Sequence, residues 1–549
     1  MRDDVLSRAV SGLRDGLGRF PGTSWLIGGA EAEASHTLRQ GMLASLLIML
    51  GSWGVGWVAA TPGSVLVVNP WLLPLRTTTA GVVTCIVLLA LGAMLLVRSW
   101  MRISQRVGGW GPQAVPVMRR ALLMWGAPLL LTVPIFSRDV YSYIAQGRAL
   151  HAGLNPYETG ISELPGWFAE GADGLWAESP SPYGPLFLAM ARLIWFVSGD
   201  VPEAAVLMFR LLSIVGIVLM VLSLPRLAAA FGSEASWALW LCLLNPLSLL
   251  VFVAAGHNDA LMIGLMTAGC AAMLDRRRLL GAALLIAAVA VKPIAVIVVP
   301  FAVLLPLADT SSRRVRMRHW LGIGLVGAAV LGLLGLILRV GFGWIPAALG
   351  AGSAALPAAP IGLLGLGVGE VVSALGGASP DVGAGYFFAA VRLFSGLVLV
   401  WLLLRPRMGN PVLWAGYAMT VVVLLSSVLQ PWYLLWILPL FAVVHVYRGR
   451  ILVLMTLVIT MLVLIVLIMQ ASVAQWIDSA AVQLIGGGVG VAYLVYLLLI
   501  DPNTADLFDM RRPSQRWNRA EGWVGLRESR PPAVSWRATD RADDEGTHR

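Results

Sequence analysis

Apolar runs separated by short polar turns follow one another from about residue 41 to residue 500. Most of these runs have the length of roughly 17–25 residues that a helix needs to cross a bilayer. We therefore expect an all-α polytopic membrane protein with about 14 membrane helices, some of them short or broken. The expected helices cover approximately residues 41–60, 78–97, 119–136, 204–223, 235–255, 259–274, 279–290, 293–307, 320–340, 385–404, 411–428, 434–447, 451–470 and 482–500.

The composition supports this class of fold and argues against others. Of the 549 residues, 58% are hydrophobic and only 12% are charged, whereas about a quarter of a soluble domain is charged. The net charge of +10 comes from arginines clustered between apolar runs, as the positive-inside rule produces, so no nucleic-acid partner is expected. Cys85, Cys242 and Cys270 lie within apolar runs, too few and too deep for a disulfide framework or a zinc site.

The arginine clusters also predict the orientation, because arginines near helix ends lie on the cytoplasmic side of a membrane. All clusters share that side, together with both termini, under two conditions. The apolar piece 184–198 must lie at the interface or re-enter instead of spanning, and 279–307 must be a hairpin broken at Lys292-Pro293. The clusters after the N-terminal segment are "RSWMRISQR" with "MRR", "PRL", "DRRR", "RRVRMR", "RPR", "YRGR" and "MRRPSQR".

The stretch "AAVAVKPIAVIVVP", residues 287–300, contains this break. Proline removes a backbone donor and disfavours the helical conformation in the residue before it. Each arm of the hairpin then has about 12–15 residues and rises only about 18–22 Å, less than the hydrocarbon core of about 30 Å. Such a break is tolerated where it lines a cavity. We expect two short half-helices, with the Lys-Pro tip toward the outer side.

This topology places the unusual polar segments on the outer face of a cytoplasmic membrane. The predicted domains are a cytoplasmic N-terminal segment 1–40, a transmembrane domain 41–500 with a large outer loop 137–203, and a cytoplasmic tail 501–549. The polar, charge-balanced composition of the tail predicts disorder. The other outer segments are 61–77, the turn 256–259, the Lys-Pro tip, a Gly/Ala/Pro-rich loop 341–384, 430–433 and 472–481.

The large outer loop opens with "FSRDVYSYIAQGRALHAGLNPYETG", in which Asp139 directly follows an apolar run. A carboxylate at this depth is costly and usually functional, and a partly desolvated one can act as a general base toward a hydroxyl. The alternative is an ion pair with Arg138 or Arg148 that merely ends a helix. Aromatic side chains of the loop suit either the faces of a sugar ring or an interfacial belt; they are Tyr141, Tyr143, Trp167, Trp176 and Tyr183.

A second polar motif, "GHND", places His257, Asn258 and Asp259 between two spans at the outer surface. These residues either hold a polar substrate or form a turn in which Asp259 caps the next helix. Their spacing gives no strong metal signature. The sequence therefore predicts no metal site and no cofactor, although it leaves a divalent cation open.

Lys292 is the only lysine among 39 basic residues. Either it extends to an interface, or it binds an anion together with the N-terminus of the half-helix that begins at Pro293. A phosphate bound there would lie near the lipid headgroups, which indicates a phospholipid-like ligand. On the same side, "QPWYLLW" puts Gln430, Trp432 and Tyr433 at a helix start, as a binding surface or as an aromatic belt.

The motifs "SRDVYSYIAQG", "GLNPYETG", "SPYGPL", "GHNDALM", "VKP" and "QPWYLLW" together resemble the actinobacterial polyprenol-phosphate-mannose-dependent α-1,6-mannosyltransferases of the MptB and MptA type. These enzymes belong to the GT-C glycosyltransferases. The resemblance covers roughly residues 40–500. The motifs are specific as a set, whereas each one alone is a weak signal.

The resemblance implies a GT-C-type bundle that transfers mannose, with inversion, from a polyprenyl-phosphate-mannose donor. The acceptor would be the 6-hydroxyl of an α-1,6-mannan on a phosphatidylinositol mannoside or lipomannan, in lipomannan and lipoarabinomannan biosynthesis. Asp139 would be the general base. The donor phosphate would contact Lys292, Arg138 and His257. The sugar and the acceptor are predicted to contact Tyr141, Tyr143, Gln146, Tyr183, Asn258, Asp259, Gln430, Trp432 and Tyr433.

One departure from the family pattern concerns the first two spans. Typical GT-C chains place the catalytic loop after the first span, whereas here it follows the third, so the role of the first two is open. The rival hypotheses are a lipid-linked-sugar flippase or transporter, since broken helices also line transport sites, a scaffold protein, and a GT-C enzyme for another sugar. A flippase has no need of the large aromatic loop that begins at Asp139.

Overall fold

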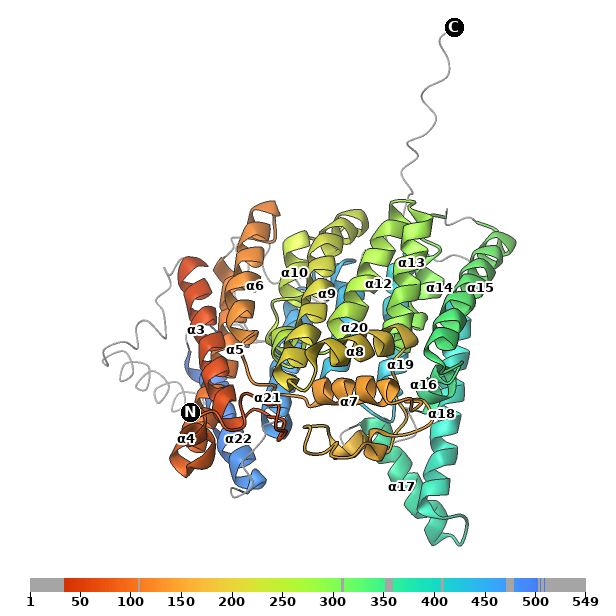
Figure 1. Cartoon of the computed structure of the whole chain (residues 1–549). Coiled ribbons are helices and arrows are strands. Elements are labelled where there is room, and N and C mark those ends of the chain that lie inside the picture. The colour runs from red at the N-terminus through yellow and green to blue at the C-terminus, as the bar shows by residue number, and fades with distance from the viewer. Residues whose placement is uncertain are drawn as a thin grey trace.

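The computed structural model describes most of the chain between residues 34 and 501. The described residues are 34–106, 109–307, 311–350, 359–405, 409–470, 478–501, 504 and 508. Nearly all of the N-terminal segment and of the C-terminal tail, including the predicted disorder of the tail, lies outside these residues. Within the described chain the regular structure is entirely helical, and the helices build one bundle (Figure 1).

The helices fall into three consecutive groups along the chain. Those before and within the large outer loop are α3 (Ala34–Val55), α4 (Leu73–Thr77), α5 (Thr79–Arg106), η1 (Pro112–Ala114), α6 (Val115–Leu129), α7 (Asp139–His151), η2 (Ile161–Glu163), η3 (Gly174–Trp176) and α8 (Pro185–Ser198). The central ones are α9 (Pro202–Phe231), α10 (Ala235–Cys242), α11 (Pro246–Ser248), η4 (Leu249–Ala254), α12 (Asp259–Leu274), α13 (Arg278–Val291), η5 (Pro293–Ile297), α14 (Val299–Ala302) and α15 (Arg313–Leu338). The last are α16 (Trp344–Gly350), α17 (Pro360–Ala374), α18 (Pro380–Leu403), α19 (Pro411–Leu424), η6 (Pro431–Tyr433), α20 (Leu434–Ala442), α21 (Gly449–Gln470), α22 (Ser479–Val495) and η7 (Tyr496–Ile500).

Seven described helices are long and apolar enough to cross a membrane. An eighth crossing results if α10 and the segment Pro246–Ala254, which meet at an angle of 56°, form one bent span. Seven further apolar helices have 10–17 residues, among them α12 and α13. The expected class, an all-α polytopic membrane protein, is therefore confirmed, whereas length and composition identify only seven or eight membrane crossings among the described residues, against about 14 expected.

The large outer loop forms helices that lie across the bundle. The long helices run side by side in Figure 1, while α7 and α8 lie crosswise near their lower end. Helix α8 corresponds to the apolar piece 184–198, and its crosswise orientation agrees with the expectation that this piece does not span. It begins at Pro185 and ends at Ser198, and the φ of 57° at the following Gly199 is a conformation that favours glycine.

The helical conformation is interrupted at Lys292, as the Lys-Pro dipeptide predicts. Helix α13 ends at Val291, and Lys292 has an extended backbone with φ −143° and ψ 112°. The second arm is not the single half-helix expected over 293–307. It consists of the five-residue 3₁₀-helix η5 and the four-residue helix α14, because Pro293 and Pro300 each remove a backbone donor. The predicted anion site therefore has no long helix whose N-terminus could contribute to binding. Of the two features expected to attract an anion, only the charge of Lys292 is left.

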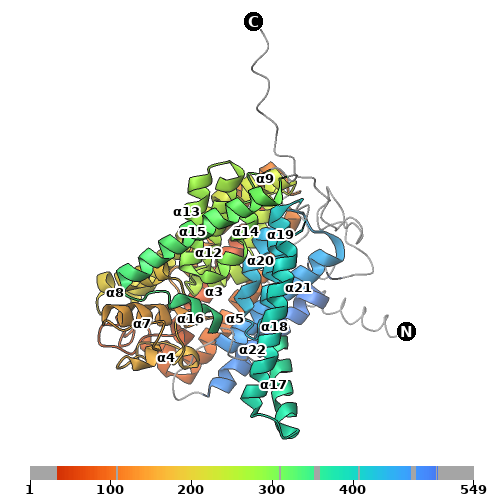
Figure 2. The ribbon, with the colours of Figure 1, turned by 90° about the vertical axis from the view of Figure 1, so that its right-hand side faces the viewer.

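A second correction concerns residues 341–384, which composition predicted to be a loop. This segment contains α16 and α17, and α17 packs against α18. Helix α17 and the adjoining end of α18 extend beyond the rest of the bundle in Figure 2, whereas α16 does not. The glycines of α17 allow close packing instead of a loop. A Cβ atom at Gly365 would lie 2.1 Å from the Phe388 ring, and one at Gly369 would lie 2.2 Å from the Pro380 carbonyl oxygen.

A buried ion pair joins the first and last parts of the described bundle. Arg98, on α5, donates through Nε to Asp501 Oδ2 at 2.7 Å, and through Nη1 to Gln40 Oε1 on α3 at 3.1 Å. Both charged side chains are almost completely buried. Residues 40 and 501 therefore lie at the same end of the bundle.

We predict that Asp501→Asn lowers the free energy of unfolding by about 3–5 kcal/mol, because it leaves the Arg98 charge buried without its carboxylate. Unfolding of the detergent-purified protein measures this change. The matched control is Asp381→Asn, which removes an exposed carboxylate of α18 and should change stability by less than about 0.5 kcal/mol. Equal stability of both variants would contradict the prediction.

Candidate active site

Asp139 is the first residue of α7 and follows an irregular segment that connects α6 to the outer loop. The backbone N–H of Asp139 donates to the Ser137 hydroxyl oxygen at 3.1 Å, which fixes the start of the helix. The carboxylate is 19% exposed. Asp139 is thus held at the edge of the packed bundle and stays accessible from outside it.

The "GHND" motif lies in a sharp turn between two helices. The π-helix η4 ends at Ala254, and α12 begins at Asp259. Gly256 has φ 72°, a left-handed conformation that a residue with a Cβ rarely adopts. This turn directs His257 and Asp259 into the bundle, where both side chains are completely buried. The alternative of a turn in which Asp259 caps the next helix does not match the structure, because Asn258 occupies the N-cap position and Asp259 is the first residue of α12.

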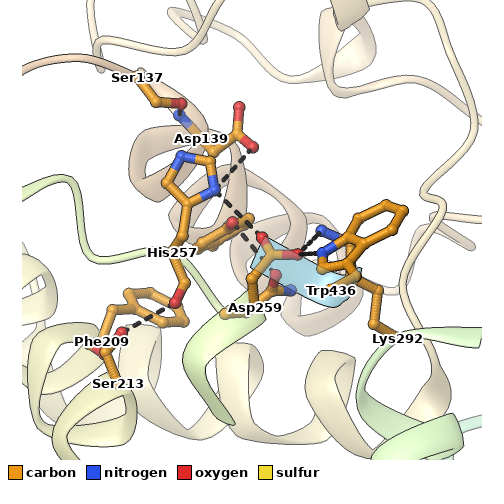
Figure 3. A network of polar contacts seen from close by, with 10 residues as sticks. Ser137, Asp139, Phe209, Ser213, His257, Asp259, Lys292 and Trp436 are labelled. Atoms are coloured by element: carbon orange, nitrogen blue, oxygen red, sulfur yellow. Dashed lines mark hydrogen bonds and ion pairs between the residues drawn. The ribbon is translucent and has the colours of Figure 1, made fainter. Parts of the chain in front are cut away.

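His257 stands between the two carboxylates (Figure 3). Its Nδ1 lies 3.7 Å from Asp139 Oδ2 and 3.3 Å from Asp259 Oδ2. On the far side of Asp259, Lys292 Nζ donates to Oδ1 at 2.7 Å. The indole Nε1 of Trp436 donates to the same oxygen. Four segments of the chain, at residues 139, 257–259, 292 and 436, therefore meet in one polar network. It runs from Asp139 through His257 to Asp259, which both Lys292 and Trp436 contact.

Aromatic rings surround this network. Lys292 Nζ lies 5.7 Å from the centre of the Tyr183 ring and 5.1 Å from that of Trp436, within the range of cation–π attraction. Tyr433 stacks on Trp436 with ring centres 4.1 Å apart. The Trp432 ring centre lies 4.5 Å from that of His257. The "QPWYLLW" motif is thus packed against the polar network.

Two more predicted residues lie in the wall beside it. The Tyr143 hydroxyl donates to Asn258 Oδ1 at 3.4 Å, and the Tyr143 and Tyr183 rings meet edge to face at 5.2 Å. Gln146, one turn along α7 from Tyr143, accepts a hydrogen bond from the Ser181 hydroxyl at 3.0 Å. These contacts tie α7 to the "SPYGP" segment before α8.

Other predicted residues contact the outer loop instead of the network. Arg138 donates to the Gly171 carbonyl oxygen at 2.7 Å and lies over the rings of Trp57 and Phe168; burial lowers the pKa of its guanidinium. The Tyr141 hydroxyl donates to the Trp57 carbonyl oxygen at 2.6 Å, and burial raises the pKa of this phenol. The contacts of both side chains indicate a bracing role.

Gln430 precedes η6, and its carbonyl oxygen accepts a hydrogen bond from the Tyr433 N–H at 3.0 Å. The described contacts of its side chain do not link it to the polar network. Trp436 is the network residue that sequence reasoning did not single out. The sequence could have identified Trp436, because it lies four positions after Trp432 in the same motif. This spacing places two helical residues on one face.

The network is polar but does not form a metal site within the described chain. No group of three or more His, Cys, Asp or Glu side chains in that part of the protein is arranged to hold a metal ion. The two carboxylates differ in their partners. Asp259 is fully buried and is contacted by Lys292, Trp436 and His257, whereas the one ion-pair partner of Asp139 among the described residues is His257. Of the two carboxylates, Asp139 is therefore the one that stays accessible to a ligand.

The fold and this network define a multi-pass membrane protein with an enclosed ionisable centre. Comparison with known families adds a specific match. Residues 38–308 match the family described as "Alpha-(1->6)-mannopyranosyltransferase, N-terminal domain", of the MptA and MptB type, and residues 363–499 match "MptB C-terminal domain". No solved structure matches the chain.

Relatives in actinobacteria extend this result. The chain is 34% identical over 370 residues to the α-(1→6)-mannopyranosyltransferase A of Mycobacterium tuberculosis, a match that covers 65% of this chain and 70% of the relative. It is 32% identical over 462 residues to a second α-(1→6)-mannopyranosyltransferase of that organism, covering 73% and 77% of the two chains. Identity to the Corynebacterium glutamicum α-(1→6)-mannopyranosyltransferase A is 28% over 372 residues, covering 62% and 75%. The chain belongs to this mannosyltransferase family and is a membrane-bound glycosyltransferase.

We predict that the two carboxylates differ in their effect on stability. Asp259→Asn should lower the free energy of unfolding by about 3 kcal/mol or more, because it leaves a largely buried Lys292 without its counter-charge. Asp139→Asn, the matched control, removes the same charge from a partly exposed site and should cost less than about 1 kcal/mol. Denaturant unfolding in detergent measures both values, and a larger loss in Asp139→Asn would contradict the assignment.

Proposed function

We propose that this protein transfers mannose from a polyprenyl-phosphate-mannose donor to the 6-hydroxyl of an α-1,6-mannan carried by a phosphatidylinositol-anchored glycolipid. The family membership supports mannosyl transfer, and the names of the relatives support the α-1,6 linkage. The observation that carries the proposal is the accessible Asp139 carboxylate at one end of a network that ends in Lys292. The remaining steps follow from the chemistry of these groups.

Asp139 acts as the general base in this proposal. It would accept the proton of the acceptor 6-hydroxyl while that oxygen attacks the anomeric carbon from the face opposite the phosphate. The product of a β-linked donor is then an α-1,6 linkage, with inversion. Because phosphate is a good leaving group, one carboxylate can suffice, unlike the carboxylate pairs of glycosidases. His257, 3.7 Å from Asp139, would orient the carboxylate.

Lys292 is the proposed contact for the donor phosphate. An ammonium group has three N–H donors, and the hydrogen bond to Asp259 occupies one of them. The others are available to phosphate oxygens, because the side chain is 12% exposed. The positive charge would stabilise the charge that grows on the leaving phosphate. We propose that Arg138, which contacts the outer loop, supports Asp139 rather than the phosphate.

The sugar would lie along the aromatic residues that enclose the network. Tyr183, Trp432 and Trp436 present ring faces beside Lys292 and His257, and such faces suit the apolar side of a sugar ring. Tyr143 and Asn258 offer hydrogen-bonding groups nearby. These contacts support residues 41–500 as the catalytic domain, with the sugar bound beneath the outer loop.

The proposed location is the cytoplasmic membrane, with both termini in the cytoplasm and the network toward the outer face. The arginine-rich turn between α12 and α13 and the start of α15 lie at the upper end of the bundle in Figure 1, whereas α7 and α8 lie toward the lower end. This separation supports the orientation, because arginines favour the cytoplasmic side. The donor, the glycolipid acceptor and membrane lipids are the expected partners.

We predict that membranes containing the protein transfer labelled mannose from polyprenyl-phosphate-mannose and discriminate against glucosyl and arabinosyl donors. Asp139→Asn should lower the rate by about 10²–10⁴-fold, the contribution typical of a general base. The control Asp381→Asn, at an exposed site on α18, should retain the wild-type rate. Full activity of Asp139→Asn would refute the base assignment, and movement of the intact donor across vesicles without transfer would favour the flippase alternative.

We predict that Lys292→Ala raises the KM for the donor about tenfold or more, since a hydrogen bond to a charged group contributes about 1.5–3 kcal/mol. The KM for the acceptor should change less. Lys292→Arg retains the charge and should recover part of the donor affinity. Steady-state kinetics with each substrate varied, normalised to folded enzyme, provide the measurement. Equal changes in both KM values would remove the phosphate role.

A further inference from the structure

Helix α9 carries a buried arginine whose charge faces no carboxylate in the described chain. Arg210 Nη1 donates to the carbonyl oxygens of Leu130 at 2.9 Å and of Thr132 at 2.7 Å. Its Nη2 donates to Thr132 Oγ1 at 2.9 Å and to the carbonyl oxygen of Ala254. A single guanidinium therefore joins the chain after α6 to the end of η4.

Three of these four acceptors are backbone carbonyls at or just beyond the ends of α6 and η4. Carbonyls in the last turn of a helix have no partner within the helix, and an unsatisfied one is costly in an apolar environment. They also lie at the negative end of the helix dipole. An arginine can satisfy several of them at once, because its five N–H donors have a fixed planar geometry. A lysine presents its three donors from one atom and cannot span both segments in the same way.

Both segments lead directly to the proposed reaction centre. Thr132 precedes Asp139 by seven positions, and Ala254 precedes His257 by three. One turn along α9 from Arg210, the Ser213 hydroxyl donates to the His257 carbonyl oxygen at 2.9 Å (Figure 3). A single face of α9 thus holds the backbone on which the two halves of the network are built.

We propose that Arg210 is a positioning residue, which sets the distance between the Asp139 carboxylate and the His257 imidazole by tying the two backbone segments to α9. It touches neither donor nor acceptor. Its effect on rate follows from geometry, because displacing a reacting group by about 1 Å can lower a rate about 100-fold. The kinetic part of this proposal rests on the proposed mannosyl transfer, whereas the structural part does not.

Arg210→Lys is the first test. The expected result is a kcat lowered about tenfold or more at an equal amount of folded protein, with donor and acceptor KM values within about threefold of wild type. Hydrogen–deuterium exchange should become faster in a peptide covering residues 250–262, and it should stay unchanged in α3 and α21. A kcat within about twofold of wild type, together with unchanged exchange, would overturn the proposal.

Two further variants separate positioning from general destabilisation. Arg98→Lys changes another buried arginine, the one paired with Asp501, and should retain kcat even if it lowers stability. An equal loss of kcat in Arg98→Lys would overturn the proposal. Thr132→Val removes one acceptor of Arg210 while preserving the shape of the side chain. Thr132→Val should lower kcat and speed up exchange, each by less than Arg210→Lys does. If a folded Thr132→Val protein shows neither change, the proposal is also overturned.

The exchange measurement distinguishes failure of this inference from failure of the proposed function. Faster exchange at residues 250–262 in Arg210→Lys supports the clamp, that is, the attachment of the Leu130–Thr132 and Ala254 segments to α9 by Arg210, even if the wild-type protein transfers no mannose. Normal mannosyl transfer with unchanged exchange and unchanged kcat in Arg210→Lys refutes the clamp and leaves the proposed function intact.

Discussion

The need to pair a buried charge organises this site. Asp259 is completely buried, and its carboxylate is stabilised there by Lys292 at 2.7 Å, the indole of Trp436 and the imidazole of His257. An isolated ionised carboxylate in such surroundings would be prohibitively costly. The pair connects the start of α12 to the end of α13, and α13 ends at this point because a proline follows Lys292. The helix break and the ion pair therefore depend on each other: the break frees Lys292 from the helix, and the pair fixes its direction.

This pairing also separates the functions of the two carboxylates. Asp259 is neutralised by the lysine and is shielded from solvent, so it is suited to hold charge in place and not to exchange a proton with substrate. Asp139 lies across His257 from it, partly exposed and within ion-pair distance of that histidine alone in the described chain. Two acidic groups in different environments can take different roles, which is a general route to assigning acid–base chemistry. The assignment of Asp139 as the proposed base therefore depends on the partners of Asp259 as well as on the position of Asp139.

The sequence was informative wherever one local cause determines the structure. Proline at position 293 predicts the break, apolar runs predict the bundle, and the clustered motifs "GHND" and "QPWYLLW" predict residues that the fold brings together. It was misleading where packing overrides composition: the glycines of α17 suggested a loop, yet they allow α17 to approach α18. It could not assign Trp436 to Asp259, which are 177 positions apart, because such a contact depends on how several helices pack. The role of Arg210 could not be predicted for the same reason. Most of its partners are backbone carbonyls, whose positions the residue pattern does not reveal.

The first two long helices, α3 and α5, lie almost entirely within the region 38–308 that matches the mannosyltransferase family, and the chain after α3 contacts the site. The segment after α3 reaches the outer loop: the Trp57 N–H donates to the Pro134 carbonyl oxygen at 2.8 Å, and the Trp57 carbonyl oxygen accepts from the Tyr141 hydroxyl. The Trp57 ring also lies beneath Arg138, the residue before Asp139. Because Trp57 is thereby bonded on both sides of Asp139 along the chain, the first span cannot shift without moving the carboxylate. The segment that follows α3 therefore acts as a brace for the start of the outer loop, on both sides of the proposed base.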